Sequence, residues 1–117
     1  MYSIAEKEEM LDKHMRDVLL RCRDVIGSEY PTAEIILYGS RARGDVRPDS
    51  DVDLLVLLDA EVPAEMKRRI HDILYDIALM EDVVISFIIK SVNKWDSPIS
   101  RATPLYQVIQ REGIKVA

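Results

Sequence analysis

Two groups of residues near the middle of the chain are of types that could bind phosphates and a metal ion. The first is Gly39-Ser40, which directly follows an apolar segment that is predicted to be a strand. A glycine at this point lets the backbone approach a ligand closely. Free N–H groups of a following turn or helix, together with the Ser40 hydroxyl, can donate hydrogen bonds to phosphate oxygens. The pair therefore indicates a phosphate-binding turn.

The second group is the pair of acids Asp51 and Asp53, which stand at the start of another apolar segment. Residues two apart on a strand point to the same face of a sheet, so the two carboxylates are expected side by side. A divalent cation relieves their mutual repulsion, and Mg²⁺ favours one or two carboxylates together with substrate phosphates and water. The two groups together predict a metal–triphosphate site.

Hydrophobic spacing predicts the elements that must position these residues. Ser3 and Glu6 fit a capping box, and the apolar residues after them predict one helix of roughly 23 residues that ends at Gly27. Strands are predicted over 33–38 and 51–58, and the uniformly apolar second strand is expected to be buried on both faces. After these strands, the pattern predicts a helix over 63–80. The apolar run 83–89 predicts a strand whose first residue is Asp82. Irregular structure is predicted over 90–103, a helix from Thr103 to Gly113 and a short strand within 114–117.

This order of elements implies an α/β (α+β) fold in one domain over 1–117, with a mixed sheet of three to four strands flanked by helices. Helix 63–80 makes the strands on either side of it parallel. Gly39-Ser40 can meet the two acids only if the first two strands are antiparallel, and the third strand then brings Asp82 to the same edge. Three carboxylates beside a phosphate-binding turn are what two-metal nucleotidyl transfer requires.

Composition argues against several other classes of protein. A formal net charge of −5 disfavours broad nucleic-acid binding, which needs a basic surface. No apolar run approaches the ~20 residues that span a bilayer. The first residues lack the apolar core of a signal peptide, so a cytoplasmic location is expected. The single cysteine, Cys22, allows no intrachain disulfide, and its place on the apolar side of the first helix predicts a core residue.

The segment LYGSRARGDVRPDSDVDLLVLL, residues 37–58, resembles the signature of the DNA polymerase beta-type nucleotidyltransferase superfamily. The chain looks like its minimal members, the small nucleotidyltransferase-domain proteins. The resemblance implies that Gly39 and Ser40 hold a nucleoside triphosphate and that Arg43 contacts phosphates or packs within the fold. It also implies that Asp51 and Asp53 bind Mg²⁺ in a two-metal site, with a third acid that maps onto Asp82.

An alternative alignment places Ser86, rather than Asp82, at the third position. A catalytic carboxylate would then be missing, and the protein would bind nucleotides without efficient turnover.

The resemblance further implies a function and a partner. Members of this family transfer a nucleoside monophosphate, here expected to be AMP from ATP, to a hydroxyl of a protein or small molecule. Small members often accompany a helical HEPT-domain protein as a toxin–antitoxin pair, so such a partner, or a homo-oligomer, would complete the site. The alternative is a catalytically weak module of the same fold that binds a nucleotide or a partner.

Overall fold

A computed structural model describes residues 1–45 and 51–117 of the chain. The part described contains one mixed sheet of five strands in the order β1-β5-β2-β3-β4. Their bounds are β1 Tyr2–Ser3, β2 Glu34–Tyr38, β3 Val52–Leu58, β4 Ile85–Ser91 and β5 Ile114–Lys115. β3 runs parallel to β4, which confirms the direction predicted for this pair. It runs antiparallel to β2, which is the condition for Gly39-Ser40 to meet the two acids.

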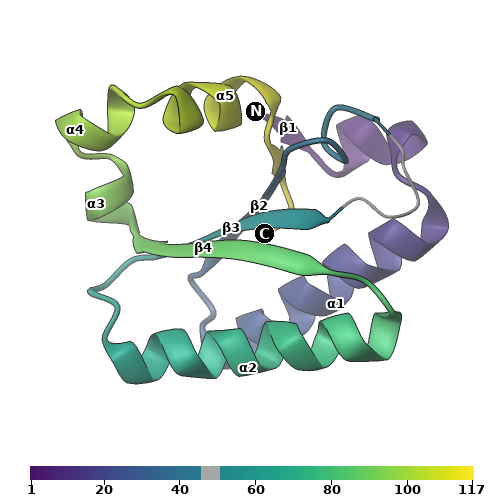
Figure 1. The fold of residues 1–117 in the computed structure, drawn as a ribbon, viewed down its shortest axis with the longest axis horizontal. Coiled ribbons are helices and arrows are strands. Elements are labelled where there is room, and N and C mark those ends of the chain that lie inside the picture. Colours follow the sequence, from purple (N-terminus) through teal and green to yellow (C-terminus); the bar gives the residue numbers. More distant parts are fainter. Residues whose placement is uncertain (46–50) are drawn as a thin grey trace.

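The helices form two layers around this sheet (Figure 1). Helices α1 (Lys13–Glu29) and α2 (Ala64–Glu81) cover one face, and the three short helices α3 (Val92–Trp95), α4 (Pro98–Arg101) and α5 (Pro104–Glu112) lie over the other. The mixed α/β fold is therefore confirmed. Within the described residues, no helix is long and apolar enough to cross a membrane.

The N-terminal region differs from the single long helix that was predicted. The capping box is present, with hydrogen bonds of 3.3 and 3.2 Å between Ser3 and Glu6, but it precedes only a 3-10 helix, η1 (Ala5–Met10). The chain extends at Leu11, and the Asp12 carboxylate then accepts a hydrogen bond of 2.7 Å from the Met15 N–H to cap α1. This second cap competes with a continuous helix.

Two further boundaries differ from the sequence prediction. α1 continues through Gly27 and ends at Glu29, just before Pro31, because the residue that precedes a proline disfavours helical backbone. Residues 90–103 are not irregular but form α3 and α4, whose N-terminal N–H groups donate to the hydroxyls of Ser91 and Ser97. The two-residue strand β1, which pairs in parallel with β5, was not predicted.

The core lies on both faces of β3, as its apolar sequence predicted. The face toward α1 and α2 buries Leu54 and Val56, whereas the face toward α3–α5 buries Leu55 and Leu57. Cys22 is fully buried among the first group, and burial raises the pKa of its thiol to about 12. Its interpretation as a core residue is confirmed.

Candidate active site

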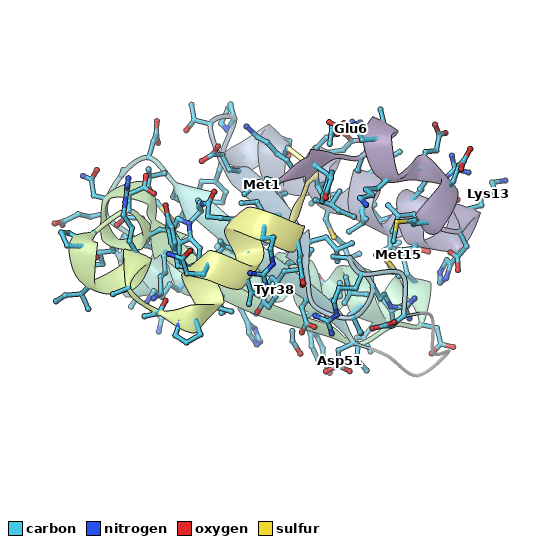
Figure 2. All side chains as sticks on the ribbon, turned by 90° about the horizontal axis from the view of Figure 1, so that it is seen from above. Met1, Glu6, Lys13, Met15, Tyr38 and Asp51 are labelled. Carbon is cyan, nitrogen blue, oxygen red and sulfur yellow. The ribbon has the colours of Figure 1, made fainter. Side chains whose placement is uncertain are left out.

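Asp51 and Asp53 lie together at the start of β3, on the sheet face that α3–α5 cover. Asp53 alternates with Val52 and Leu54, so its side chain shares a face with Leu55 and Leu57. Asp51 is exposed and Asp53 is half-buried. Burial and, second, repulsion from the negative charge of Asp51 raise the pKa of Asp53. Figure 2 labels Asp51 and also Tyr38, the last residue of the neighbouring strand.

The Gly39 turn meets Asp53 because β2 and β3 are antiparallel. Tyr38, at the end of β2, is the register partner of Asp53, and Gly39 follows it with a positive φ of 79°. A Cβ atom on Gly39 would collide with Oδ2 of Asp53. Glycine is therefore required here twice, for its backbone conformation and for the close approach of the carboxylate.

Residues 40–45 form a series of tight turns rather than a short helix. The carbonyl of Ser40 accepts hydrogen bonds from the N–H groups of Arg43 at 3.2 Å and Asp45 at 3.0 Å. The Arg43 guanidinium lies 3.5 Å from a carboxylate oxygen of Asp45 and 3.5 Å from one of Glu112, at the end of α5. Burial and, second, Asp51 raise the pKa of Asp53, and the positive charge of Arg43 opposes this rise as the smallest of the three influences. Arg43 thus connects the turn to α5 through its ion pair with Glu112.

Ser86 is the residue of β4 that stands beside the two acids. It is the register partner of Asp53 across the parallel β3–β4 pair. Its hydroxyl donates a hydrogen bond of 3.1 Å to Oδ2 of Asp51. Both strands therefore contribute to one polar cluster at the start of the sheet, in which two members are acids and one is a serine.

Asp82 lies in a different environment from the one that its sequence position suggested. The strand predicted to start at this residue begins at Ile85, and Asp82 is instead the exposed C-cap of α2, in the left-handed region with φ 54° and ψ 49°. Among residues 1–45 and 51–117, no group of three Asp, Glu, His or Cys side chains could hold a metal ion. The structure thus brings Asp51 and Asp53 together without Asp82.

Tyr38 is a neighbour of the site that the sequence pattern did not single out. Burial and, second, the charge of Asp53 raise the pKa of its phenol. The sequence could have indicated it, because Tyr38 directly precedes Gly39 and the alternation along the strand puts its side chain on the same face as Ile36. An antiparallel register was needed to place it opposite Asp53.

The described residues also line a groove of about 700 Å³ at the opposite end of β3 and β4, away from the acids. Residues from the start of α2, the end of β4 and the start of α3 form its walls, including Lys67, Lys90 and Lys94. It holds no paired acids. The acids and the glycine turn, where the sequence predicted a metal–triphosphate site, therefore lie at the other end of these strands from the groove.

Burial raises the pKa of Asp53, with repulsion from Asp51 as the second cause, and this gives a pH-dependent prediction. A carboxyl group with a native pKa above its unfolded value binds more protons when folded, so stability falls as pH rises. We expect this contribution to be complete below the ordinary pKa of 3.8 and to be lost as pH rises through the raised native pKa.

Urea unfolding of the wild type and of Asp53→Asn at a series of pH values tests this expectation. The free energy of unfolding of the variant relative to wild type should rise with pH across that interval, because only the wild type has to ionise a disfavoured acid. A difference that does not change with pH would contradict the environment described for Asp53.

Comparison with known proteins identifies the family of the chain. The family model of the nucleotidyltransferase domain matches residues 19–113, from α1 through the end of α5. The chain belongs to the nucleotidyltransferase domain family, and the family resemblance of residues 37–58 is confirmed.

Two curated relatives come from Methanocaldococcus jannaschii. The chain is 42% identical over 74 residues to "Putative protein adenylyltransferase MJ1305". The aligned segment covers 62% of this chain and 46% of that protein. It is also 42% identical over 55 residues to a protein of the same description, MJ0141, covering 47% of this chain and 56% of that protein. The chain thus matches about half the length of each relative.

A solved structure shares the fold. It is a crystal structure of a toxin–antitoxin with AMP-PNP, which matches with a TM-score of 0.57 and 17% sequence identity. The match covers 91% of this chain and 73% of the other. At this identity the likeness establishes the arrangement of strands and helices.

Proposed function

We propose that the protein is a Mg²⁺-dependent adenylyltransferase that transfers AMP from ATP to a hydroxyl group of a protein. The observation that carries the proposal is the convergence of Asp51 and Asp53 on the Gly39 turn, at one end of the sheet. The two relatives described as protein adenylyltransferases support the choice of AMP and of a protein acceptor.

The residues present fit a divalent cation. Two carboxylates share one face, and their repulsion contributes to the raised pKa of Asp53, which a cation would offset. A bound Mg²⁺ would neutralise charge on the phosphates and orient them. Asp51 and Asp53 would hold this ion, while the Gly39-Ser40 turn would bind phosphate oxygens and Arg43 would add a positive charge nearby.

In the reaction, the acceptor oxygen forms a bond to the α-phosphorus of ATP. The bond from that phosphorus to the oxygen that bridges the α- and β-phosphates breaks, pyrophosphate leaves with that oxygen, and the proton of the acceptor hydroxyl passes to solvent water. The chain's own contribution is to position the reacting groups and to stabilise the charge on the phosphates, since phosphoryl-type transfers depend mainly on these two effects.

A HEPT-type partner in a toxin–antitoxin pair would serve as the acceptor in this proposal. The fold match to a toxin–antitoxin that was crystallised with AMP-PNP supports this choice. A second candidate function, a nucleotide- or partner-binding module with weak turnover, is favoured by one observation: a serine, not an acid, stands beside Asp53 on β4.

Two experiments test the proposal. Calorimetry measures the binding of ATP, GTP, CTP and UTP with and without Mg²⁺. A transfer assay measures the label that a protein receives from ATP labelled at the α- or the γ-phosphate. We expect Mg²⁺-dependent binding that is strongest for ATP, and covalent labelling of a protein from α-labelled ATP alone. Asp51→Asn/Asp53→Asn should abolish both, while the matched pair Asp59→Asn/Asp76→Asn, at two exposed acids outside the site, should not.

The results separate the two candidates. Nucleotide binding without label transfer would favour the binding module. Mg²⁺-independent binding, or binding that survives in the Asp51→Asn/Asp53→Asn protein, would refute the site itself.

A further inference from the structure

The number of carboxylates at the site limits the number of metal ions that it can hold. Asp51 and Asp53 together supply two negative charges, which one divalent cation balances. Two-metal sites place the ions about 3.5–4 Å apart. Protein carboxylates and substrate phosphates together have to offset the mutual repulsion of the two ions. Among the described residues, no third acid, histidine or cysteine joins this pair.

Ser86 is the side chain of β4 that contacts the pair of acids. It lies directly opposite Asp53 in the β3–β4 register, and it is in contact with Asp51 through its hydroxyl. The side chain therefore belongs to the cluster, but it is neutral. A neutral hydroxyl adds a hydrogen-bond donor and contributes no charge toward a second ion.

The hydrogen bond from Ser86 has a direction that matters for metal binding. The hydroxyl donates to Oδ2 of Asp51 at 3.1 Å, so it engages one of the two oxygens of this carboxylate and restrains its orientation. Asp51 is exposed and precedes the first residue of β3, so the strand pairing alone restrains its carboxylate weakly. Partners that hydrogen-bond to metal ligands orient them and tune their affinity.

We propose that this site binds one divalent cation with the nucleotide, and that Ser86 is a positioning residue that orients the Asp51 carboxylate toward that ion. The inference rests on the proposed function, and it departs from the two-metal site that the family resemblance implied. It also assigns no ligand role to Asp82, which is exposed at the end of α2.

The experiment counts metal ions rather than turnover. Mn²⁺ is titrated into the protein with α,β-methylene-ATP, which cannot release pyrophosphate, and electron paramagnetic resonance measures the free ion. Titrating the nucleotide alone supplies the correction for ions that bind without protein. We expect one nucleotide-dependent ion per chain in the wild type, and the same count and affinity in Asp82→Asn.

Substitutions of Ser86 test the positioning role. Ser86→Ala should keep one ion but weaken its binding by about 10-fold, the lower end of the effect of losing such a partner. Ser86→Thr, which retains the hydroxyl, should restore the affinity. Ser86→Asp adds a third carboxylate and should bind two ions, whereas the matched Ser28→Asp, on the exposed end of α1, should bind one.

Each outcome decides one claim. Two ions in the wild type, or loss of an ion in Asp82→Asn, would overturn the one-metal site. Wild-type affinity in Ser86→Ala would overturn the positioning role. A wild type that binds no nucleotide-dependent ion would instead refute the proposed function. The wild-type count and the Ala–Thr pair settle the inference even if Ser86→Asp fails to fold.

Discussion

Replacing Asp53 by Asn should abolish metal-dependent nucleotide binding and reduce transfer by at least about 10³-fold, while the protein stays folded. The carboxylate is one of two metal ligands in the proposed site, and a metal that stabilises charge in the transition state is worth several kcal/mol. About 4 kcal/mol corresponds to a factor of 10³ in rate. The amide has nearly the same shape as the acid, so packing against Gly39 is preserved.

The same substitution should leave stability at neutral pH equal or higher. Burial and the charge of Asp51 both disfavour the ionised form of Asp53, and the neutral amide removes that cost. Calorimetric titration with Mg²⁺ and ATP, combined with urea unfolding, checks both halves of the prediction. Asp76→Asn, an exposed acid on α2, is the control with the same change of charge.

An Asp53→Asn protein that binds and transfers as well as wild type would show that the chemistry lies elsewhere. A variant that loses binding because it unfolds would instead contradict the description of Asp53 as an acid whose ionised form is disfavoured by burial and by Asp51. The two measurements distinguish these cases.

Replacing Gly39 by Ala should reduce metal-dependent nucleotide binding and transfer by about 100-fold. The new Cβ would collide with Oδ2 of Asp53, so the carboxylate has to move, and a displacement of about 1 Å in a reactive site costs on the order of 10²-fold. The positive φ of 79° adds a backbone penalty of roughly 1–2 kcal/mol in stability for any residue with a Cβ.

Gly27→Ala is a matched control for this substitution. Gly27 lies within α1, at a place where a Cβ would meet nothing within 4 Å. Alanine should therefore raise the free energy of unfolding by about 0.5–1 kcal/mol and leave nucleotide binding unchanged. Circular dichroism and urea unfolding of both variants separate the loss of the site from the loss of the fold.

The double variant Gly39→Ala/Asp53→Asn gives a stricter test of the contact. If the alanine acts by displacing the Asp53 carboxylate, it should cause little further loss of binding once that carboxylate is gone, so the two effects should not add. Full additivity, or wild-type binding by Gly39→Ala alone, would contradict the close approach of the turn to the acid.

The parallel pairing of β3 with β4 could be predicted from the sequence, because a helix between two strands implies that they are parallel. The antiparallel direction of β2 was only the condition under which the glycine turn and the acids would meet. Both pairings are present in the structure. The period of two along β3 also predicted that Asp51 and Asp53 share a face.

The residue that stands beside Asp51 and Asp53 on β4 could not be decided from the sequence, because it depends on where α2 ends and β4 begins. Val83 and Val84 are as apolar as the strand that follows them, so the pattern extended the strand back to Asp82. In the structure, α2 ends in a left-handed turn at Asp82, and β4 begins three residues later. This shift makes Ser86 the partner of Asp53.

The residue types and their spacing by themselves determined the mixed α/β fold, the parallel direction of β3 and β4 and the shared face of Asp51 and Asp53, since all of these follow from local periodicity and chain connectivity. Only the tertiary structure decided which side chain completes the cluster. Register between neighbouring strands depends on where each strand starts, and that start is set by the helix end and its packing rather than by the apolar pattern.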